Sequence, residues 1–173
     1  MAQDSGLSGS GHLVIVGGGL RPDNAKVFEK IVEYAGGAQI ARFVVLPSAS
    51  LMTRDAEDFC TYLTRYGVTA DRSEVLNVNF KNAASATNEI GILEKVRRAS
   101  GVYLAGGDQR RLVRLLTEKD GSDTPLLAEI RKVYERGGVI AGSSAGASAQ
   151  SETMLAVSGL NDKLIDEGLD TLD

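Results

Sequence analysis

Short apolar runs and helical repeats alternate along the chain. Continuous apolar runs predict buried strands at 13–16, 43–46, 75–78, 102–105 and 139–141. Between them, apolar residues recur at helical spacing over 27–35, 59–66, 92–96, 112–116 and 126–134, and Asp23 and Asn88 suit helix caps. This alternation predicts an α/β fold with a mostly parallel sheet covered by helices on both faces. The run at 139–141 should lie inside that sheet.

Three predicted strands end in glycine-bearing loops. These loops are Gly17 to Gly19, Gly106 to Gly107 and Gly142 to Gly146. The carboxyl ends of parallel strands lie at one edge of the sheet, where ligands bind, so the loops should converge there. The first loop does not complete the dinucleotide pattern G-x-G-x-x-G, because residue 22 is proline.

The third of these loops, Gly142-Ser143-Ser144-Ala145-Gly146, carries the most specific chemistry. A G-x-S-x-G turn between a buried strand and a helix predicts a nucleophile elbow. Ser144 would then sit in strained backbone above the sheet, with the amide of Ala145 free to bind an oxyanion. Flanking residues must be small for strand and helix to pack so closely. The structural alternative is a plain Gly/Ser-rich loop.

The loop after the run at 102–105 offers further polar groups. Asp108 is expected to cap the following helix, and the Gly107 amide could be a second oxyanion donor. Arg110, Arg111 and Arg114 lie within about one helical turn of each other, so two of them can share a helix face. They form either a solvated face or a carboxylate-binding site at the mouth of a pocket.

Composition and charge narrow the class of protein. The 173 residues, 43% hydrophobic and 24% charged, fit one globular domain, and the net charge of −4 argues against nucleic-acid binding. We expect a flexible lead-in over 1–12, an α/β domain over 13–157 and an acidic tail over 158–173. The N-terminus has no apolar core of a secretory signal and no run spans a bilayer, so a cytoplasmic protein without membrane contact is expected.

The sequence shows no set of residues that would bind a metal ion or another cofactor. Cys60 is the single cysteine and His12 the single histidine, and they lie far apart, so no metal site or disulfide is expected. The helical pattern around Cys60 predicts a packed or half-buried thiol. No cofactor is predicted.

The pairing of Gly106-Gly107-Asp108-Gln109 with Gly142-Ser143-Ser144-Ala145-Gly146-Ala147 resembles the cyanophycinase group of S51 serine peptidases. The aspartyl dipeptidases are their relatives, and the resemblance spans residues 13 to about 157. It implies a three-layer α/β sandwich like that of class I glutamine amidotransferases, with Ser144 replacing the elbow cysteine. Ser143 stands where the family usually has threonine.

This resemblance implies hydrolysis of peptide bonds next to aspartate. Cyanophycinases release β-Asp-Arg dipeptides from cyanophycin, a polyaspartate chain carrying arginine on its side-chain carboxyls. Ser144 would attack the aspartyl carbonyl, with the Ala145 and Gly107 amides as oxyanion donors and water releasing the acyl-enzyme. Substrate would be bound by Asp108, Gln109, Arg110 and Arg111. Relatives are often dimers, so a homo-oligomer is expected.

An arginine-bearing substrate also needs acids nearby. Asp55, Glu57 and Asp58 could supply them, although acids in the first turn of a helix are already accounted for by the helix dipole.

The general base is missing from this set of residues. His12 precedes the first strand, so it should lie at the amino edge of the sheet, opposite the elbow. In the family, the catalytic histidine and an acid that orients it follow the serine. Asp162 is the nearest match to that acid by position, with Glu152 second, although both could equally be solvated acids.

Three possibilities account for the missing histidine. The chain is one product of a cleaved precursor whose partner chain brings the histidine, or it is shortened, or it is a non-catalytic member that binds aspartyl peptides. A sheet that ended soon after 139–141 would have an uncovered edge, which favours the first two. A simple esterase or glutaminase-type site on the same scaffold is a further alternative.

Overall fold

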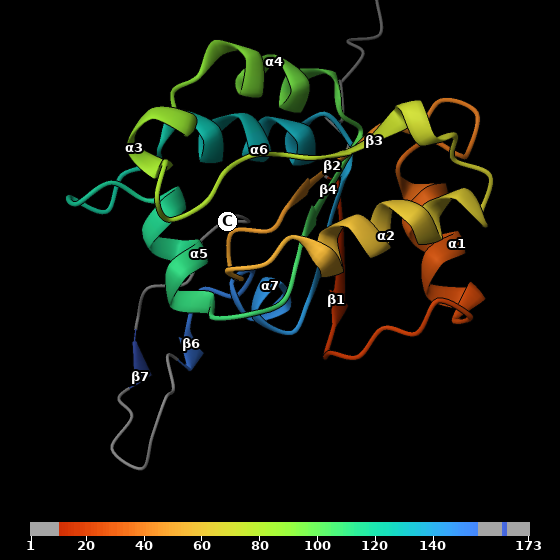
Figure 1. The fold of residues 1–173 in the computed structure, drawn as a ribbon, viewed down its shortest axis with the longest axis horizontal. Coiled ribbons are helices and arrows are strands. Elements are labelled where there is room, and N and C mark those ends of the chain that lie inside the picture. Colours follow the sequence, from red (N-terminus) through yellow and green to blue (C-terminus); the bar gives the residue numbers. More distant parts are fainter. Residues whose placement is uncertain (1–10, 156–163, 166–173) are drawn as a thin grey trace, which may run out of the picture.

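A five-stranded parallel sheet forms the centre of the molecule (Figure 1). The computed structural model describes residues 11–155 together with Leu164 and Ile165. The strand order is β1-β5-β4-β2-β3, with bounds β1 His12–Val16, β5 Val139–Ser143, β4 Gly101–Leu104, β2 Phe43–Leu46 and β3 Ser73–Val75. A separate antiparallel pair joins β6 Met154–Leu155 to β7 Leu164–Ile165.

Helices cover both faces of this sheet, which confirms the predicted three-layer α/β sandwich. One face carries α1 Ala25–Tyr34 and α2 Arg54–Thr64. The other carries α4 Ile90–Arg98, α5 Gln109–Leu116, α6 Pro125–Glu135 and α7 Ala145–Ser148. The 3₁₀ turn η1 Ala70–Arg72 precedes β3, and the short α3 Ala83–Ala86 follows it.

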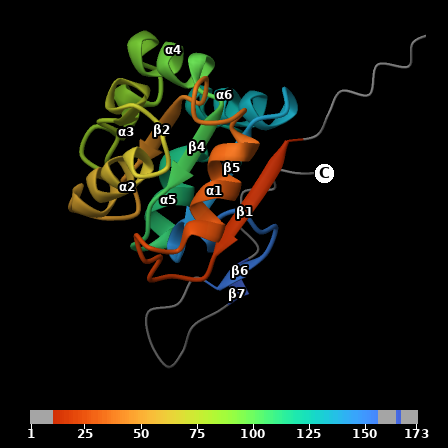
Figure 2. The same ribbon diagram turned by 90° about the vertical axis from the view of Figure 1, so that its right-hand side faces the viewer.

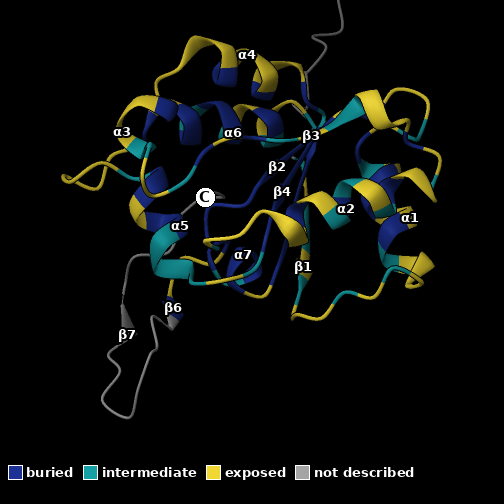
Figure 3. Cartoon of the chain, viewed as in Figure 1, coloured by how far each residue is buried: buried dark blue, intermediate teal, exposed yellow. Residues whose placement is uncertain are grey.

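Alternation along the strands divides the core into two apolar clusters. Phe43 and Val45 of β2 face the helices α1 and α2, whereas Val44 and Leu46 face the opposite layer. The central strands β2, β4 and β5 are buried along their whole length (Figure 3). Their continuous apolar runs therefore reflect burial on both faces, as predicted.

The strand β5 lies between β1 and β4, so the expected internal position of 139–141 is confirmed. β1 lies at the edge of the sheet (Figure 2), and Ile15 on it is 57% exposed. β1 begins at His12, one residue earlier than predicted, and its residues are exposed or half-buried, so the prediction of a buried strand at 13–16 is wrong.

Some sequence predictions on local structure are wrong. The third strand covers Ser73–Val75 rather than 75–78; Leu76 and Val78 are buried in the loop that follows it, so their apolar character reports burial rather than strand pairing. Neither expected cap stands at its helix start. Asp23 pairs with Arg21, and α1 is preceded by Asn24. Asn88 donates to the Ala84 carbonyl at the end of α3, and Glu89 precedes α4.

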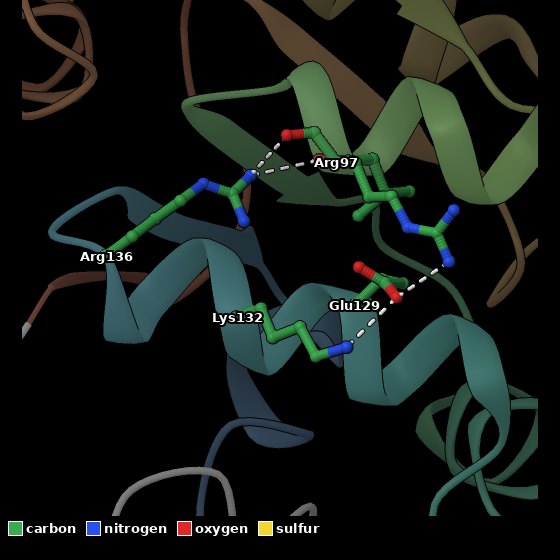
Figure 4. A network of polar contacts seen from close by, with 5 residues as sticks. Arg97, Glu129, Lys132 and Arg136 are labelled. Carbon is green, nitrogen blue, oxygen red and sulfur yellow. Dashed lines mark hydrogen bonds and ion pairs between the residues drawn. The ribbon is translucent and has the colours of Figure 1, made fainter.

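A polar network joins α4 to α6 (Figure 4). The Glu129 carboxylate, on a side chain only 8% exposed, accepts from Arg97 at 3.0 Å and from Lys132 at 3.1 Å. Arg136 reaches the end of α4 and donates to the carbonyls of Val96, Arg97 and Ala99. The Val96 carbonyl also accepts from the Ala99 amide at 3.1 Å, and the guanidinium adds a partner from the neighbouring helix at a helix end where carbonyls otherwise lack donors.

Replacing Glu129 with glutamine is expected to destabilise the fold in a pH-dependent way. The bonded Arg97 guanidinium holds the pKa of Glu129 below its ordinary value. A carboxyl with a lowered pKa in the folded state stabilises the protein above its unfolded pKa, and this contribution disappears as the pH falls through the folded value. Since the two partners are about half exposed, we expect a loss of about 1 kcal/mol at pH 7, which shrinks as the pH falls below the ordinary glutamate value and through the lower pKa of the folded state.

Urea unfolding of wild type and variant between pH 7 and about pH 3 measures this difference. Glu94→Gln is the matched control, because Glu94 contacts Arg98 at 3.8 Å with both side chains largely exposed. Its effect should stay within about 0.5 kcal/mol. A Glu129 effect no larger than the Glu94 effect, or one independent of pH, would contradict the structural role of this network.

Candidate active site

Ser144 lies at the turn between β5 and α7. It is the only non-glycine residue with a positive φ in the part of the chain that the structure describes, with φ 53° and ψ −114°. Such backbone costs on the order of 1–3 kcal/mol and persists where the surrounding structure enforces it. Ser144 is exposed, whereas the five residues of β5 before it are buried. The predicted strand-turn-helix elbow is therefore confirmed.

Close packing around the elbow requires its glycines. A Cβ on Gly146 would lie 2.0 Å from the Leu104 carbonyl oxygen on β4. A Cβ on Gly142 would lie 2.3 Å from the carbonyl oxygen of Gly146. Both contacts are with backbone, which cannot rotate away as a flexible side chain can. The expectation that small residues must flank the serine is thus met.

The three glycine loops surround Ser144, because they follow the adjacent strands β1, β5 and β4. A Cβ on Gly18 would lie 3.7 Å, and one on Gly106 3.4 Å, from the Cβ of Ser144. The Ser144 amide donates to the Val16 carbonyl at 2.9 Å, which ties the elbow to the end of β1. The predicted convergence of the loops is confirmed.

Gly107 adopts a conformation that only glycine accepts readily, with φ 143°. A Cβ there would lie 2.2 Å from the Ala49 carbonyl oxygen, and the next amide, of Asp108, donates to that same oxygen at 2.8 Å. The loop after β2 therefore holds Gly107 in place. Its backbone lines the same cavity as Ser144.

Asp108 caps α5, as predicted. Its carboxylate accepts from the Arg110 amide at 3.0 Å and from the Arg110 guanidinium at 2.9 Å. The Arg110 side chain lowers the pKa of Asp108. The predicted substrate-binding residues Asp108, Gln109, Arg110 and Arg111 stand beside the cavity at the start of α5 and do not line it.

A cavity of about 350 Å³ opens beside Ser144. Glycine loops and the elbow form one wall, and the aromatic core under α1 and α2 forms the other. The lining residues are Gly19, Leu20, Phe28, Ser50, Asp55, Asp58, Phe59, Tyr62, Tyr103, Ala105, Gly106, Gly107, Ser143 and Ser144.

Tyr103 and Ser143 belong to this wall and were not anticipated as site residues. The Tyr103 phenol bonds the Ser143 side chain, and burial raises the pKa of Tyr103 to about 12. The phenol thus stays protonated near neutral pH and cannot serve Ser144 as a base. From the sequence, Tyr103 was expected in a buried strand and Ser143 in the elbow loop, with no role assigned to either.

The structure places His12 away from the elbow, as predicted. His12 opens β1, pairs with Val139 and stacks on Tyr34 with ring centroids 3.9 Å apart. The other end of β1, at Val16, pairs with Ser143 beside the elbow. Four residues of strand put roughly 13 Å between these two ends. The 173 residues therefore hold no histidine placed to activate Ser144.

Of the two candidates for the orienting acid, Glu152 and Asp162, the structure describes only Glu152. Glu152 is exposed in the turn after α7. Asp162 lies outside the described residues.

The side chains that commonly bind metals are scattered over the fold. Within 11–155, no group of three or more His, Cys, Asp or Glu side chains is placed to hold a metal ion. Cys60 is half-buried, and burial raises the pKa of its thiol, which agrees with the packed thiol expected from the sequence. The described helices include none with the length and apolar character needed to cross a bilayer.

The fold and the elbow define an α/β protein with a serine at the position of a nucleophile. Residues 13–172 match the family described as Peptidase family S51, so the chain belongs to this family. The resemblance found in the two glycine motifs is thereby confirmed.

Known relatives agree with this assignment. A cyanophycinase of Trichormus variabilis is 34% identical over 126 residues, 71% of this chain and 39% of its own length. A cyanophycinase of Geminocystis herdmanii is 30% identical over 146 residues, 83% of this chain and 50% of its own. The crystal structure of a peptidase from an acI-B1 actinobacterium superposes with a TM-score of 0.61 at 27% identity, covering 84% of this chain and 59% of that one.

These curated relatives are longer proteins. The chain spans half or less of the length of each cyanophycinase named above.

Proposed function

We propose that the protein is a serine peptidase of the cyanophycinase type that cleaves aspartyl peptide bonds through an acyl-enzyme on Ser144. The observation that carries this proposal is the strained, exposed Ser144 at a cavity between three glycine loops. Such strain concentrates at functional sites because a plain connection has no need of it. Membership in a peptidase family makes hydrolysis the chemistry that this serine would perform.

Acyl transfer on this site would run in two steps. The Ser144 hydroxyl attacks the aspartyl carbonyl carbon and loses its proton to a base, and the amides of Ala145 and Gly107 stabilise the resulting oxyanion. The C–N bond then breaks as the leaving amine takes up that proton. Water attacks the ester, restoring the serine and releasing the acid. One such donor typically lowers the activation barrier by about 2.7–4 kcal/mol.

The base would be a histidine from polypeptide other than these 173 residues. We propose a further C-terminal segment, or a second chain of the same precursor, as its source, with Asp162 as the orienting acid. The greater length of the relatives supports this source. The Gln109 and Arg111 side chains, with the Asp108–Arg110 pair, are proposed to contact the substrate outside the cavity.

A non-catalytic role is the second candidate function. It is favoured by one observation, the position of His12 at the wrong end of β1. In that role the same cavity would bind aspartyl peptides without cleaving them.

Intact-mass analysis followed by substrate turnover tests the proposal. The purified protein is weighed to find any second polypeptide carrying a histidine, and is then incubated with cyanophycin, with aspartyl dipeptides and with a simple ester. Release of β-Asp-Arg dipeptides is the expected result. Hydrolysis of the ester alone would point to an esterase. Dipeptide binding without turnover, in a sample that contains the histidine, would support the non-catalytic role.

A further inference from the structure

We propose that Tyr103 is a positioning residue for the nucleophile, because its phenol, bonded to the Ser143 side chain, holds the elbow backbone in the conformation that presents Ser144. The inference rests on the proposed function, since it takes Ser144 as the reacting group. Tyr103 acts on the reaction only through Ser143, the residue directly before the nucleophile.

Backbone pairing supports the last residue of β5 from one side only. β5 pairs with β1 through to Ser143, but its pairing with β4 ends one residue earlier, at Leu104 and Gly142. After Leu104 the chain leaves β4 for the second glycine loop. In the described sheet, Ser143 therefore has a paired strand on its β1 side and none on its β4 side.

A side-chain hydrogen bond from β4 takes the place of that pairing. Tyr103 lies opposite Ala141 in the parallel register, so its side chain and that of Ser143, two residues further on, share one face of the sheet. The Tyr103 phenol is hydrogen-bonded to the Ser143 side chain along this face. The two residues are only 5% and 8% exposed, so little water competes for this bond.

The aromatic layer under α2 fixes the ring of Tyr103. Phe59 stacks on it with ring centroids 3.5 Å apart and an interplanar angle of 10°. Phe59 in turn lies 5.7 Å from Phe28 and 6.4 Å from Phe43, and these phenylalanines are buried. A hydroxyl on a ring held in this way has a defined position. It can therefore hold its partner in place.

The elbow needs such support because its backbone is strained. Ser144 has a φ of 53°, which persists only where the surrounding structure enforces it. On the β1 side, the Ser144 amide donates to the Val16 carbonyl at 2.9 Å. On the β4 side, the bond from Tyr103 holds Ser143, whose carbonyl belongs to the same peptide unit as that amide. The two contacts together orient the peptide that leads into the nucleophile.

Packing alone does not require this pair of hydroxyls. Replacing both partners of a buried hydrogen bond with apolar groups of the same shape is nearly neutral for stability. The two hydroxyls are found where β5 passes into the elbow, and both residues line the cavity that opens at Ser144. This location indicates a role in the geometry of the site.

Tyr103→Phe and Ser143→Ala each remove one hydroxyl of the pair. In the complete enzyme acting on an aspartyl peptide, we expect kcat to fall about 10-fold in each variant, the factor for one hydrogen bond. KM should change less than about 2-fold, because the substrate contacts are intact. The double variant should lose no more than either single variant, since both act through one bond. Ser143→Thr keeps a hydroxyl and should stay within about 3-fold of the wild-type kcat.

Tyr66→Phe is the matched control in the same aromatic layer. The Tyr66 ring stacks on Phe28 with centroids 4.8 Å apart, and its hydroxyl donates to the Pro22 carbonyl at 2.7 Å. This variant also loses a bonded phenol hydroxyl, but one remote from the elbow, so its kcat should equal that of wild type. Each kcat is expressed per serine that reacts with the fluorophosphonate probe, so that unfolded protein does not contribute.

Several outcomes overturn the inference while the enzyme still cleaves its substrate. An effect of Tyr103→Phe on KM alone would make the phenol a substrate contact. Additive losses in the double variant would show that the two hydroxyls act separately. A kcat of Ser143→Thr as low as that of Ser143→Ala, or an unchanged kcat in both single variants, would show that the bond does not matter. The proposed function stands in each of these cases.

Hydrogen exchange at the Ser144 amide separates this inference from a failure of the proposed function. If no peptide is cleaved, the proposed function fails, and the positioning contact is measured by amide exchange, which needs no turnover. The exchange rate at Ser144 should rise about 10-fold in Tyr103→Phe and Ser143→Ala, and not in Tyr66→Phe, while the amides of β2 exchange as in wild type. An unchanged rate at Ser144 in both variants overturns the inference.

Discussion

Ser144→Ala is expected to abolish both hydrolysis and labelling by a fluorophosphonate probe. The probe forms a covalent bond with an activated serine oxygen, and alanine has none to offer. Loss of a serine nucleophile typically lowers kcat by about 10⁴-fold or more, since the remaining oxyanion donors cannot replace it. Intact mass after probe treatment and kcat on an aspartyl peptide measure the two effects.

Ser151→Ala provides the control for this result. Ser151 is an exposed serine seven positions further on, and its hydroxyl donates to the carbonyls of Ser148 and Thr153. The Ser151→Ala protein should react with the probe and turn over substrate as wild type does.

Ser144→Gly adds a stability measurement, because glycine accepts a positive φ that alanine does not. It should be inactive yet more stable than Ser144→Ala by about 1 kcal/mol. Probe attachment that survives at another serine of the Ser144→Ala protein would reject Ser144 as the nucleophile.

Gly146→Ala is expected to cause the largest loss of stability. The added methyl group would lie 2.0 Å from the Leu104 carbonyl oxygen, so α7 and β4 must separate to admit it. Overpacking against a well-packed core costs about 1–3 kcal/mol, and a clash with backbone belongs at the upper end or beyond. A loss of about 3 kcal/mol lowers the melting temperature of a domain of this size by roughly 6–12 °C. Probe labelling of Ser144 should fall with it, since the elbow moves with α7.

Gly91→Ala is the matched comparison. A Cβ on Gly91 would meet only the Glu89 carboxylate, at an ordinary 3.7 Å, and the residue lies exposed on α4. Its melting temperature should stay the same or rise slightly, because alanine favours a helix by about 0.5–1 kcal/mol over glycine. If Gly146→Ala and Gly91→Ala melt within about 2 °C of each other, the close approach of α7 to β4 is wrong.

The fold was predictable because its continuous apolar runs mark the segments that are buried. β2, β4 and β5 are covered on both faces, and a strand covered in this way needs an apolar side chain at every position. The same logic failed at Leu76 and Val78, which are equally buried without pairing as strand. An apolar side chain indicates that a residue is buried. Whether that residue belongs to a strand depends on a neighbouring strand to pair with, which the local sequence does not specify.

The elbow that carries Ser144 was predictable from the sequence, and the cavity beside it was not. Gly142 and Gly146 are required locally by the turn, so the motif is visible in five consecutive residues. The cavity instead joins α2 to the end of β4, and its contacts arise only when distant segments meet. From the sequence, Asp55 and Asp58 are acids at the start of a helix, and the structure adds that both line the cavity. Nothing in the local pattern distinguishes them from Glu57.

The position of the elbow between β1 and β4 has a consequence for synthesis of the protein. The first strand must wait for a partner that leaves the ribosome more than a hundred residues later, because His12 pairs with Val139 and Val16 with Ser143. Ser144 gains its amide contact to Val16 only at that moment. Such distant pairing slows folding. Under the proposed function, a nascent chain therefore carries no reactive serine until its sheet has closed.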